Sequence, residues 1–340
     1  MSLTIDFHAH LLEPYVFEQT FPQSAFAAFG ARPEGAQTEP GSRIAIAHAR
    51  MLNPELRLAD MDERGVDVQV LSSITVMQYT GWAEPRLQLD LESRINDAIA
   101  ALSRHCPERF VGSFTLPLSD IDLALSETER AVTELGLRVA NLPASYDGAY
   151  LGARRYRPLW ERFRELGIVA FIHPDGVRDP WFQDFALWNS IGQSIEESKV
   201  MASLILEGVL EDMPELRIVI AHGGGFLPHN FGRLDRNFHN RPATAANISK
   251  LPSEYLRSFY FDTCVYDPAV LSVLLDRVGA DRLLLGTDYP VGDEDSLEIL
   301  HRAGVSGDEL AAIAGGNAAR LLDLGIKPDQ ISEGPGTLQF

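Results

Sequence analysis

The sequence predicts an α/β protein built as a (β/α)8 barrel (a TIM barrel), distorted by an insertion after its first strand. Eight short apolar runs rich in β-branched residues alternate with longer segments of helical periodicity, a pattern typical of buried parallel strands joined by helices. Histidines and aspartates stand at the ends of several runs, where barrel enzymes place their catalytic groups. No glycine-rich dinucleotide turn follows the first run, so the pattern favours a barrel over an open doubly wound sheet.

Each predicted strand is followed along the chain by a predicted helix. We expect the strands at residues 3–7, 66–71, 110–115, 137–142, 168–172, 216–221, 258–262 and 282–286. We expect the helices at residues 54–64, 86–105, 119–135, 156–166, 193–212, 225–239, 267–279 and 306–323.

The chain is long enough and apolar enough to bury one large core. It has 340 residues, of which 45% are hydrophobic, and α/β barrels of about 250 residues or more form one domain. We therefore expect a single domain over residues 1–326 and a C-terminal arm at 327–340. Residues 11–53 contain proline, glycine and aromatic residues with weak periodicity, which predicts an insertion over the barrel mouth.

The charge balance limits the partners of this protein. Its net charge of −19 repels polyanions, so we expect no binding to nucleic acid or to anionic membranes. No apolar stretch approaches the length of about 20 residues that a membrane span needs. The two cysteines cannot form a disulfide framework and no signal peptide opens the sequence, so we expect a cytoplasmic protein.

A candidate metal site is the main functional feature of the sequence. His8 and His10 lie two apart on the first strand and point to the same side, which suits a divalent ion; taken alone, they could equally be held by backbone hydrogen bonds. His173 and Asp288, at the ends of the fifth and eighth strands, complete a set of three nitrogens and one carboxylate oxygen. We predict one divalent ion per chain, preferably Zn2+ because the set is rich in nitrogen, with Mn2+, Co2+ or Fe2+ as alternatives.

His222 is a fifth candidate, at the end of the sixth strand and before three glycines. It could be a ligand or an acid and base. Because four ligands already exist and imidazole titrates near neutral pH, we assign His222 to proton transfer, with a satisfied core histidine as the alternative. Asp288 is counted as catalytic as well as metal-binding. None of the three lysines lies on a predicted strand, so we expect no carboxylated lysine bridging two ions and no Schiff base.

Two further side chains are candidates for substrate binding. Arg233, on the helix after His222, could hold a carboxylate bidentately, or could lie on a solvated helix face. Trp188, in the loop after the fifth strand, could wall an aromatic or dienoic substrate, or could be a hydrophobic lid residue.

Several motifs occur in order along most of the chain, and together they resemble the amidohydrolase-related metal-dependent decarboxylases. These motifs are IDFHAH at residues 5–10, RLADMDERG at 57–65, RFVGSFTLP at 109–117, FIHP at 171–174, AHGGG at 221–225, GTDYP at 286–290 and GNA at 316–318.

The resemblance implies a function for each candidate residue. It implies one zinc held by the four ligands, His222 as the proton-transferring base, and Arg233 as a carboxylate anchor that reaches the neighbouring site in a homodimer. It also implies a second substrate-binding arginine in the insertion. Arg43 and Arg50 are the nearest candidates, although neither aligns without a gap.

We therefore predict a non-oxidative decarboxylase of an unsaturated or aromatic carboxylic acid. Zinc would lower the pKa of its bound water to about 7 and polarise the substrate, and His222 would assist proton delivery to the carbon that bears the carboxylate. In an alternative version, substrate oxygens bind the metal directly and a nearby acid protonates the ring, and the sequence does not separate the two. One alternative is a hydrolase or hydratase acting on a ring-cleavage product, a lactone or a similar carbonyl compound. The other is a non-catalytic barrel that binds a small acid.

Overall fold

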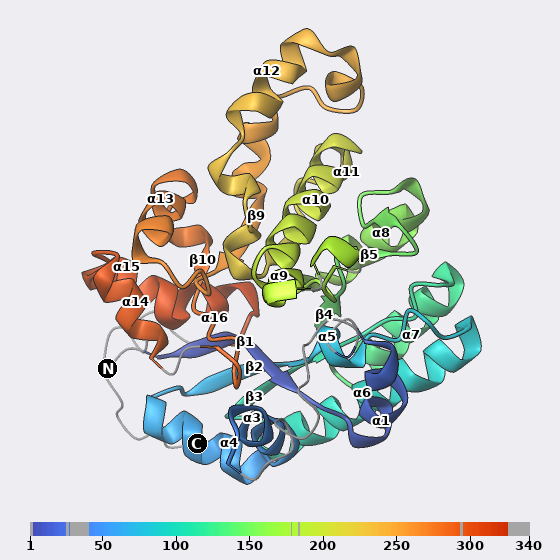
Figure 1. The fold of residues 1–340 in the computed structure, drawn as a ribbon, viewed down its shortest axis with the longest axis vertical. Coiled ribbons are helices and arrows are strands. Elements are labelled where there is room, and N and C mark those ends of the chain that lie inside the picture. The colour runs from blue at the N-terminus through green and yellow to red at the C-terminus, as the bar shows by residue number, and fades with distance from the viewer. Residues whose placement is uncertain are drawn as a thin grey trace.

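The computed structural model describes residues 3–24, 27, 41–177, 179–182, 184–292 and 295–325, and it confirms the predicted barrel. Eight parallel strands follow the order β1-β2-β3-β4-β7-β8-β9-β10 (Figure 1). Their bounds are β1 (Ile5–Leu11), β2 (Val68–Ser73), β3 (Phe110–Phe114), β4 (Val139–Leu142), β7 (Val169–Ile172), β8 (Arg217–Ile220), β9 (Phe259–Asp262) and β10 (Leu283–Leu284). Every strand overlaps one of the eight predicted apolar runs.

The barrel closes between its first and last strands through a few backbone contacts. The Phe7 N–H donates to the carbonyl of Leu285 at 2.8 Å, and the His10 N–H donates to the carbonyl of Tyr289 at 2.8 Å. The second of these, with the bond from the Tyr289 N–H to the carbonyl of His8 at 3.2 Å, makes an isolated parallel bridge between Ala9 and Tyr289 rather than a continuous ladder. The barrel is therefore nearly closed, and this seam is its least regular part.

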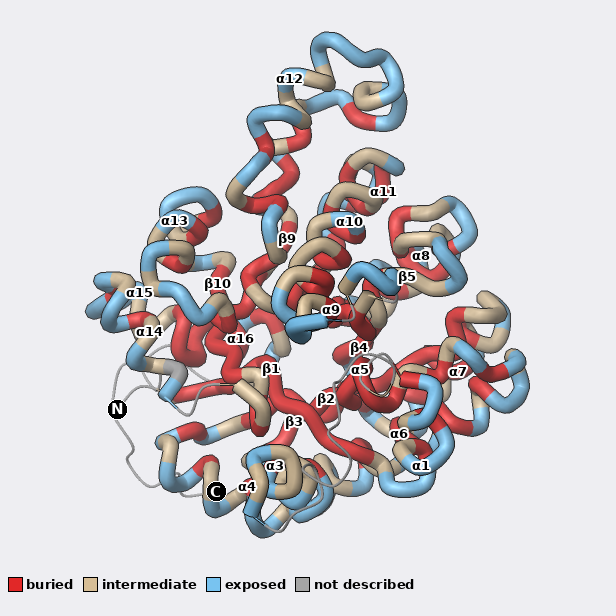
Figure 2. The backbone as a smooth tube through the Cα atoms, viewed as in Figure 1, coloured by how far each residue is buried: buried red, intermediate tan, exposed pale blue. Residues whose placement is uncertain are grey.

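The helices surround the strands. Figure 2 shows the strands as buried segments and the outer faces of the helices as exposed ones. The longer helices are α3 (Arg43–Leu52), α4 (Pro54–Arg64), α6 (Pro85–His105), α7 (Ile121–Thr133), α8 (Arg157–Leu166), α10 (Gly192–Leu206), α12 (Gly232–Asn240) and α13 (Pro268–Val278). The shorter ones are α1 (Pro14–Thr20), α5 (Thr75–Gln78), α9 (Leu187–Ser190), α11 (Val209–Asp212), α14 (Ser296–Arg302), α15 (Gly307–Ala311) and α16 (Asn317–Leu321).

The strands are apolar on both faces because both faces are covered. One cluster inside the barrel includes Phe7, Val139, Val169 and Phe171. A larger cluster lies between the strands and the helices and includes Ile172 and most of the buried side chains of the outer layer. This double burial explains why the strands read in the sequence as continuous apolar runs rather than alternating ones.

Three predicted helices differ from the observed ones. The helix expected at 193–212 divides at Gly208, whose backbone adopts φ +79°. The helix expected at 225–239 begins only at Gly232, because short 3-10 turns occupy His222–Gly224 and Leu227–His229. The helix expected at 306–323 contains a π turn over Ala312–Gly316, within which Gly315 packs closely against the backbone of Leu3.

The insertion after the first strand is more regular than expected. Strand β1 extends to Leu11, and the described part of the insertion contains α1, α3 and a 3-10 turn at Phe21–Gln23. Residues 28–40 of the insertion and the predicted arm at 327–340 lie outside the described residues. A two-stranded hairpin of β5 (Ser145–Tyr146) and β6 (Ala149–Tyr150) was not predicted.

Helix α12 extends away from the barrel and lies at the far end of the long axis in Figure 1. None of its residues is buried. Within the described part of the chain, no helix is both long and apolar enough to cross a membrane. The cytoplasmic location stays a prediction.

Candidate metal centre

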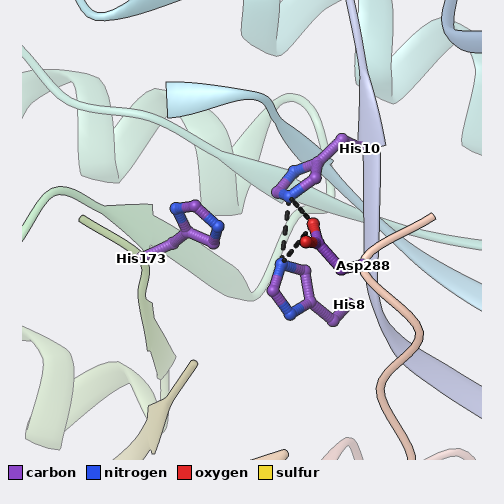
Figure 3. Close-up of side chains that lie close together, drawn as sticks. All are labelled: His8, His10, His173 and Asp288. Atoms are coloured by element: carbon purple, nitrogen blue, oxygen red, sulfur yellow. Dashed lines mark hydrogen bonds and ion pairs between the residues drawn. The ribbon is translucent and has the colours of Figure 1, made fainter. Parts of the chain in front are cut away.

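The structure brings His8, His10, His173 and Asp288 together at the carboxyl ends of the strands (Figure 3). One potential ligand atom from each residue lies within 4.8 Å of the others. The Nε2 atoms of His8 and His10 are 3.0 Å apart, and Asp288 Oδ1 lies 3.0 Å from His10 Nε2 and 3.4 Å from His8 Nε2. Ligands of a single ion, each about 2.0–2.2 Å from it, have this mutual spacing.

A β-bulge at His8 helps to place the two histidines. Asp6 pairs with Gln69 on β2, whereas Ala9 pairs with Leu71, so β1 carries one extra residue between these pairs. A bulge bends a strand and turns its side chains, and bulges are frequent beside active sites. The sequence alone gave the H-x-H spacing but no sign of the bulge.

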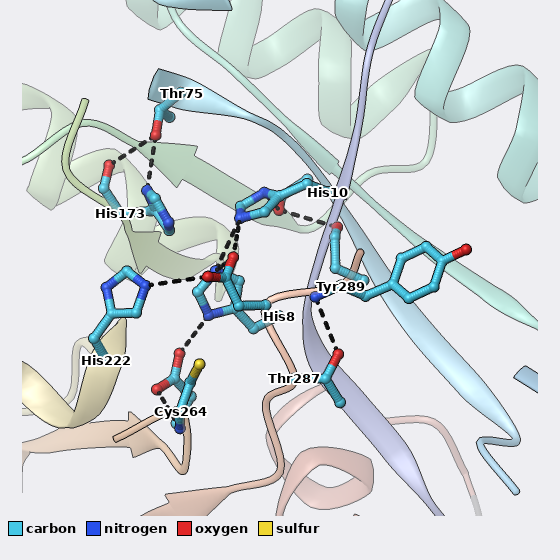
Figure 4. Close-up of polar contacts among 12 residues, drawn as sticks. His8, His10, Thr75, His173, His222, Cys264, Thr287 and Tyr289 are labelled. Carbon is cyan, nitrogen blue, oxygen red and sulfur yellow. Dashed lines mark hydrogen bonds and ion pairs between the residues drawn. The ribbon is translucent and has the colours of Figure 1, made fainter. Parts of the chain in front are cut away.

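Each ligand imidazole has a partner at its other nitrogen, and Figure 4 shows that of His173, Thr75. His8 Nδ1 donates to Asp262 Oδ2 at 2.7 Å, and His173 Nδ1 donates to the carbonyl of Pro174 at 2.9 Å, with Thr75 Oγ1 at 2.8 Å. His10 Nδ1 lies 3.3 Å from Ser72 Oγ. These contacts leave the Nε2 lone pairs free to face the centre, which is the second-shell pattern of metal-binding histidines.

Burial sets the protonation states that a cation requires. It lowers the pKa of His10 to about 4, and lowers the pKa of His173 well below its ordinary value, with neighbouring histidines adding to the effect. Burial opposes the charge of Asp288, but His8, His10 and His222 outweigh it and hold its pKa well below the usual range. Neutral imidazoles and an ionised carboxylate are the ligand forms of these groups, so the donor set fits a divalent ion.

His222 faces the same centre from the other side. Its Nε2 lies 3.8 Å from Asp288 Oδ2, and its Nδ1 forms a very short contact with Glu197 Oε1. Burial disfavours the imidazolium, but Glu197 and Asp288 outweigh that effect and raise the pKa of His222 well above its ordinary value. The direction of this shift is opposite to that of His10 and His173.

The glycines after His222 allow helix α10 to approach. A Cβ on Gly225 would lie 2.2 Å from the carbonyl of Ser194 and 2.9 Å from Glu197 Oε2, and the backbone of Gly225 adopts φ +63°. Only glycine meets both requirements. The glycine run thus brings the backbone of α10 close enough for Glu197 to reach His222.

Two functional residues also adopt an uncommon backbone conformation. His222 has φ 50° and Asp288 has φ 55°, a region that non-glycine residues rarely occupy. Such conformations persist where surrounding contacts enforce them, and they gather at functional sites.

The sequence analysis missed Asp262 and Glu197. Asp262 ends a predicted strand, so the strand-end argument that found His173 and Asp288 applied to it as well. Glu197 lies within helix α10 and is completely buried, and no local pattern distinguishes it from the half-exposed or buried acids around it.

The structure places the predicted substrate-binding residues in four different settings. Arg233 is exposed on α12, and Trp188 is buried in a cluster that includes Met51 of α3 and Met77 of α5. Arg43 donates to the carbonyl of Val291, three residues after Asp288, at 3.0 Å. Arg50 pairs with Asp60, with Nε and Oδ2 at 2.7 Å. Of the four, Arg43 and Trp188 contact loops at the barrel mouth.

The two lysines among the described residues both lie outside the strands. That no lysine bridges two ions stays a prediction. Lys199 lies in α10 and Lys250 lies in a turn, whereas Lys327 is outside the described residues. A second group of potential ligands, His8, His222 and Cys264, shares His8 with the first group. The number of ions per chain stays a prediction.

Comparisons with known proteins agree with this fold and site. The amidohydrolase family model matches residues 5–324. A 2-amino-3-carboxymuconate-6-semialdehyde decarboxylase of Dictyostelium discoideum is 34% identical over 241 residues, which cover 70% of this chain and 67% of the relative. A 2-keto-4-carboxy-3-hexenedioate hydratase of a Sphingobium strain is 26% identical over 343 residues, covering 94% of this chain and 96% of the relative.

Solved structures of decarboxylases share the whole architecture. The 5-carboxyvanillate decarboxylase LigW of Sphingomonas paucimobilis superposes with a TM-score of 0.81 at 25% identity, covering 95% of this chain and 99% of that one. A 5-carboxyvanillate decarboxylase of Novosphingobium aromaticivorans, in complex with manganese and 4-hydroxy-3-methoxy-5-nitrobenzoic acid, has a TM-score of 0.81 at 22% identity, covering 95% and 96%. The chain therefore belongs to the amidohydrolase family and, within it, to the branch that contains the metal-dependent decarboxylases.

Proposed function

We propose that this enzyme removes the carboxylate of an unsaturated or aromatic carboxylic acid as carbon dioxide, without oxidation. The observation that carries the proposal is the presence of four imidazoles with two different roles. Three face one point, and burial lowers the pKa of two of them, His10 and His173, while Glu197 outweighs burial and raises the pKa of His222 beside them. A site that only bound a cation would not need the fourth, charged imidazole.

The residues divide the chemistry between them. A divalent ion held by His8, His10, His173 and Asp288 would supply a Lewis acid that polarises the substrate. His222 Nε2 lies close enough to Asp288 to deliver its proton to a carbon above the centre. The bond from this carbon to the carboxylate breaks, its electron pair forms the new bond to hydrogen, and carbon dioxide departs. Glu197 favours reprotonation of His222 from solvent for the next cycle.

We assign the carboxylate contacts to arginines. Arg43 is the better candidate in the insertion, because it reaches the segment that follows Asp288, whereas Arg50 is engaged by Asp60. Arg233 points into solvent on a helix that leaves its own barrel, so it would reach a site only in a neighbouring subunit. This geometry supports a homodimer in which each subunit supplies Arg233 to the other.

We propose one Zn2+ per chain, on the grounds of the nitrogen-rich ligand set. Mn2+ is the main competitor, since the Novosphingobium decarboxylase contains manganese. Metal analysis of the purified protein by mass spectrometry decides between them. About one equivalent of a single metal is expected, and the variant His173→Ala should lose it because one of four donors is gone. Full metal content in His173→Ala would contradict the ligand assignment.

The reaction is tested by measuring carbon dioxide release from a panel of hydroxylated benzoates and carboxymuconate semialdehydes. We expect release by the parent protein, and a loss of about a hundredfold or more in His222→Asn, which keeps the metal but has no proton to give. His105→Asn, at the exposed end of α6, is the matched control. Near-parental turnover in His222→Asn would rule out the proton role.

A hydratase is the second candidate, favoured by the similarity to the Sphingobium hydratase over almost the whole chain. The same proton on His222 could be added to a conjugated double bond together with hydroxide. Incorporation of labelled oxygen from water into an unsaturated acid, with no carbon dioxide released from any member of the panel, would replace the decarboxylase by the hydratase.

A further inference from the structure

Arg57 is a buried cation that the proposed reaction does not use. It belongs to the RLADMDERG motif and lies on α4 with 1% of its surface exposed. The charges of Asp6 and Asp60 favour the cation, but its hydrogen bonds go to a side-chain amide and a backbone carbonyl. Burying an arginine is costly, so its contacts have to be favourable ones.

These contacts join three segments of the barrel. The guanidinium donates to the backbone carbonyl of His10 on β1 in a very short contact, and to Gln69 Oε1 on β2 at 2.9 Å. It also lies over the ring of Tyr289, 4.7 Å from the ring centre, in a cation–π contact. His10 is a proposed ligand, and Tyr289 directly follows the ligand Asp288.

The contacts continue from Gln69 to the backbone of both ligand-bearing segments. Gln69 Nε2 donates to Asp6 Oδ2 at 3.1 Å. The Asp6 carboxylate accepts from the backbone N–H of His8 at 3.1 Å, and from the N–H and hydroxyl of Thr287 at 3.0 and 2.7 Å. Arg57 and its partners therefore hold β1 against the segment of Asp288.

A second residue of the same motif holds Tyr289 from outside. Asp60 lies one helical turn after Arg57 and accepts the hydroxyl of Tyr289 at 2.8 Å. Tyr289 is thus fixed at its ring face by Arg57 and at its hydroxyl by Asp60. The seam it crosses has only isolated backbone contacts, so these side chains supply much of its rigidity.

We propose that Arg57 and Asp60 are positioning residues that set the affinity of the metal centre, by holding the Asp288 segment in register with His8 and His10. The inference rests on the proposed ligand set but not on the reaction. His8 and His10 lie on one side of the seam between β1 and the last strand, and Asp288 lies on the other. A shift of a fraction of an ångström at this seam would move the ligands apart, and the placement of the ligands governs the affinity for the metal ion.

The test is the dissociation constant of Zn2+ from the zinc-loaded protein, measured by competition with a chelator. Arg57→Lys keeps a cation but loses the fork and the flat face that stacks on the ring. We expect Zn2+ to bind about 10- to 100-fold more weakly to this variant. With Co2+ at saturation, its visible absorption bands should also differ from those of the parent, because the ligand geometry itself has changed.

Arg109→Lys is the matched control. Arg109 also ties α4 to the strands, through Asp62 at 2.8 Å and the carbonyl of Asp67 at 2.9 Å, but it lies at the opposite end of the barrel. The Arg109→Lys variant should bind Zn2+ with the affinity of the parent protein. Equal weakening in both variants would show a general loosening of α4 and overturn the proposal, as would affinity within about twofold of the parent in Arg57→Lys.

Tyr289→Phe and Asp60→Asn keep the test open if Arg57→Lys fails to fold. Tyr289→Phe removes only the hydroxyl contact at the outer end of the network, whereas Asp60→Asn weakens that contact and also the ion pair with Arg50. We expect Zn2+ to bind on the order of threefold more weakly, with the unfolding temperature unchanged. Parental affinity in both would overturn the proposal. The measurement of Zn2+ affinity needs no substrate. Its outcome therefore does not depend on whether the protein is found to be a decarboxylase.

Discussion

Glu197 is the residue on which the charge of His222 depends. Its side chain is fully buried, and burial raises its pKa to about 7, while the imidazole beside it opposes the rise. Between these two groups the proton stays on His222, whose pKa is raised by the carboxylate. In the proposed reaction the protonated form of His222 is the active one, so we expect activity below the pKa of His222 and its loss as the pH rises through that pKa.

We expect Glu197→Gln to move this loss of activity to lower pH. Without the carboxylate, burial dominates and the pKa of His222 falls, so the alkaline limb of the kcat/KM profile should shift downward by about one pH unit or more. The measurement is the pH profile of carbon dioxide release.

Glu196→Gln is the control for that profile. Glu196 is the preceding residue on the same helix, but its carboxylate contacts Tyr150 and Lys199, each at 2.8 Å, outside the metal centre. The alkaline limb of the kcat/KM profile of Glu196→Gln should match that of the parent protein. An unshifted limb in Glu197→Gln would show that another group carries the titrating proton.

At the scale of elements, the metal centre depends on how close α10 lies to the end of β8. We expect Gly225→Ala to destabilise the protein by about 1–3 kcal/mol, because the new Cβ would meet the carbonyl of Ser194 and the backbone has a positive φ. It should also displace Glu197 and lower turnover. Thermal unfolding and carbon dioxide release are the measurements.

Gly304→Ala separates the two effects of a glycine substitution. Gly304 also has a positive φ, but no heavy atom lies within 4 Å of its would-be Cβ. The Gly304→Ala variant should be less stable only because alanine is strained at a positive φ. It should keep the turnover of the parent protein at temperatures where it is folded. If Gly225→Ala behaves in the same way, the approach of α10 is not what the glycine run provides.

Element boundaries show which parts of the fold a sequence pattern can predict. All eight strands were found because burial on both faces leaves a continuous apolar run. The helix after His222 was placed too early, because the glycines at 223–225 and Pro228, which break a helix, form 3-10 turns ahead of it. The two helices of the insertion were missed because they have only 7 and 10 residues and lie in a segment that proline and glycine residues interrupt.

At the scale of the molecule, α12 is an arm without a core of its own. It has no buried residue, and a helix of this length gains little stability by itself in water. Its place at the tip of the molecule fits docking against a second copy, which would bring Arg233 of the partner subunit towards the metal centre.

Mixed dimers test this arrangement. A dimer purified with one Arg233→Ala subunit and one His222→Asn subunit should regain about half of the parental activity, because one of its two sites has both groups intact. Each variant alone should be nearly inactive. An inactive mixed dimer would show that Arg233 serves its own subunit, and a monomer in light scattering would refute the dimer.

The sequence by itself determined the barrel and the side chains of the metal centre. Parallel strands of a barrel bring their carboxyl ends to one face, so residues at strand ends meet there whatever the loops do. This is why His8, His10, His173 and Asp288 could be grouped without coordinates.

Only the tertiary structure decided what surrounds them. Glu197 and Arg57 reach the centre from the buried faces of helices, and their contacts depend on how closely each helix packs against the strands. No local pattern encodes such a distance, because an amphipathic helix signals that one of its faces is buried but not which strand that face will meet. The charge of His222 and the rigidity of the barrel seam follow from that packing.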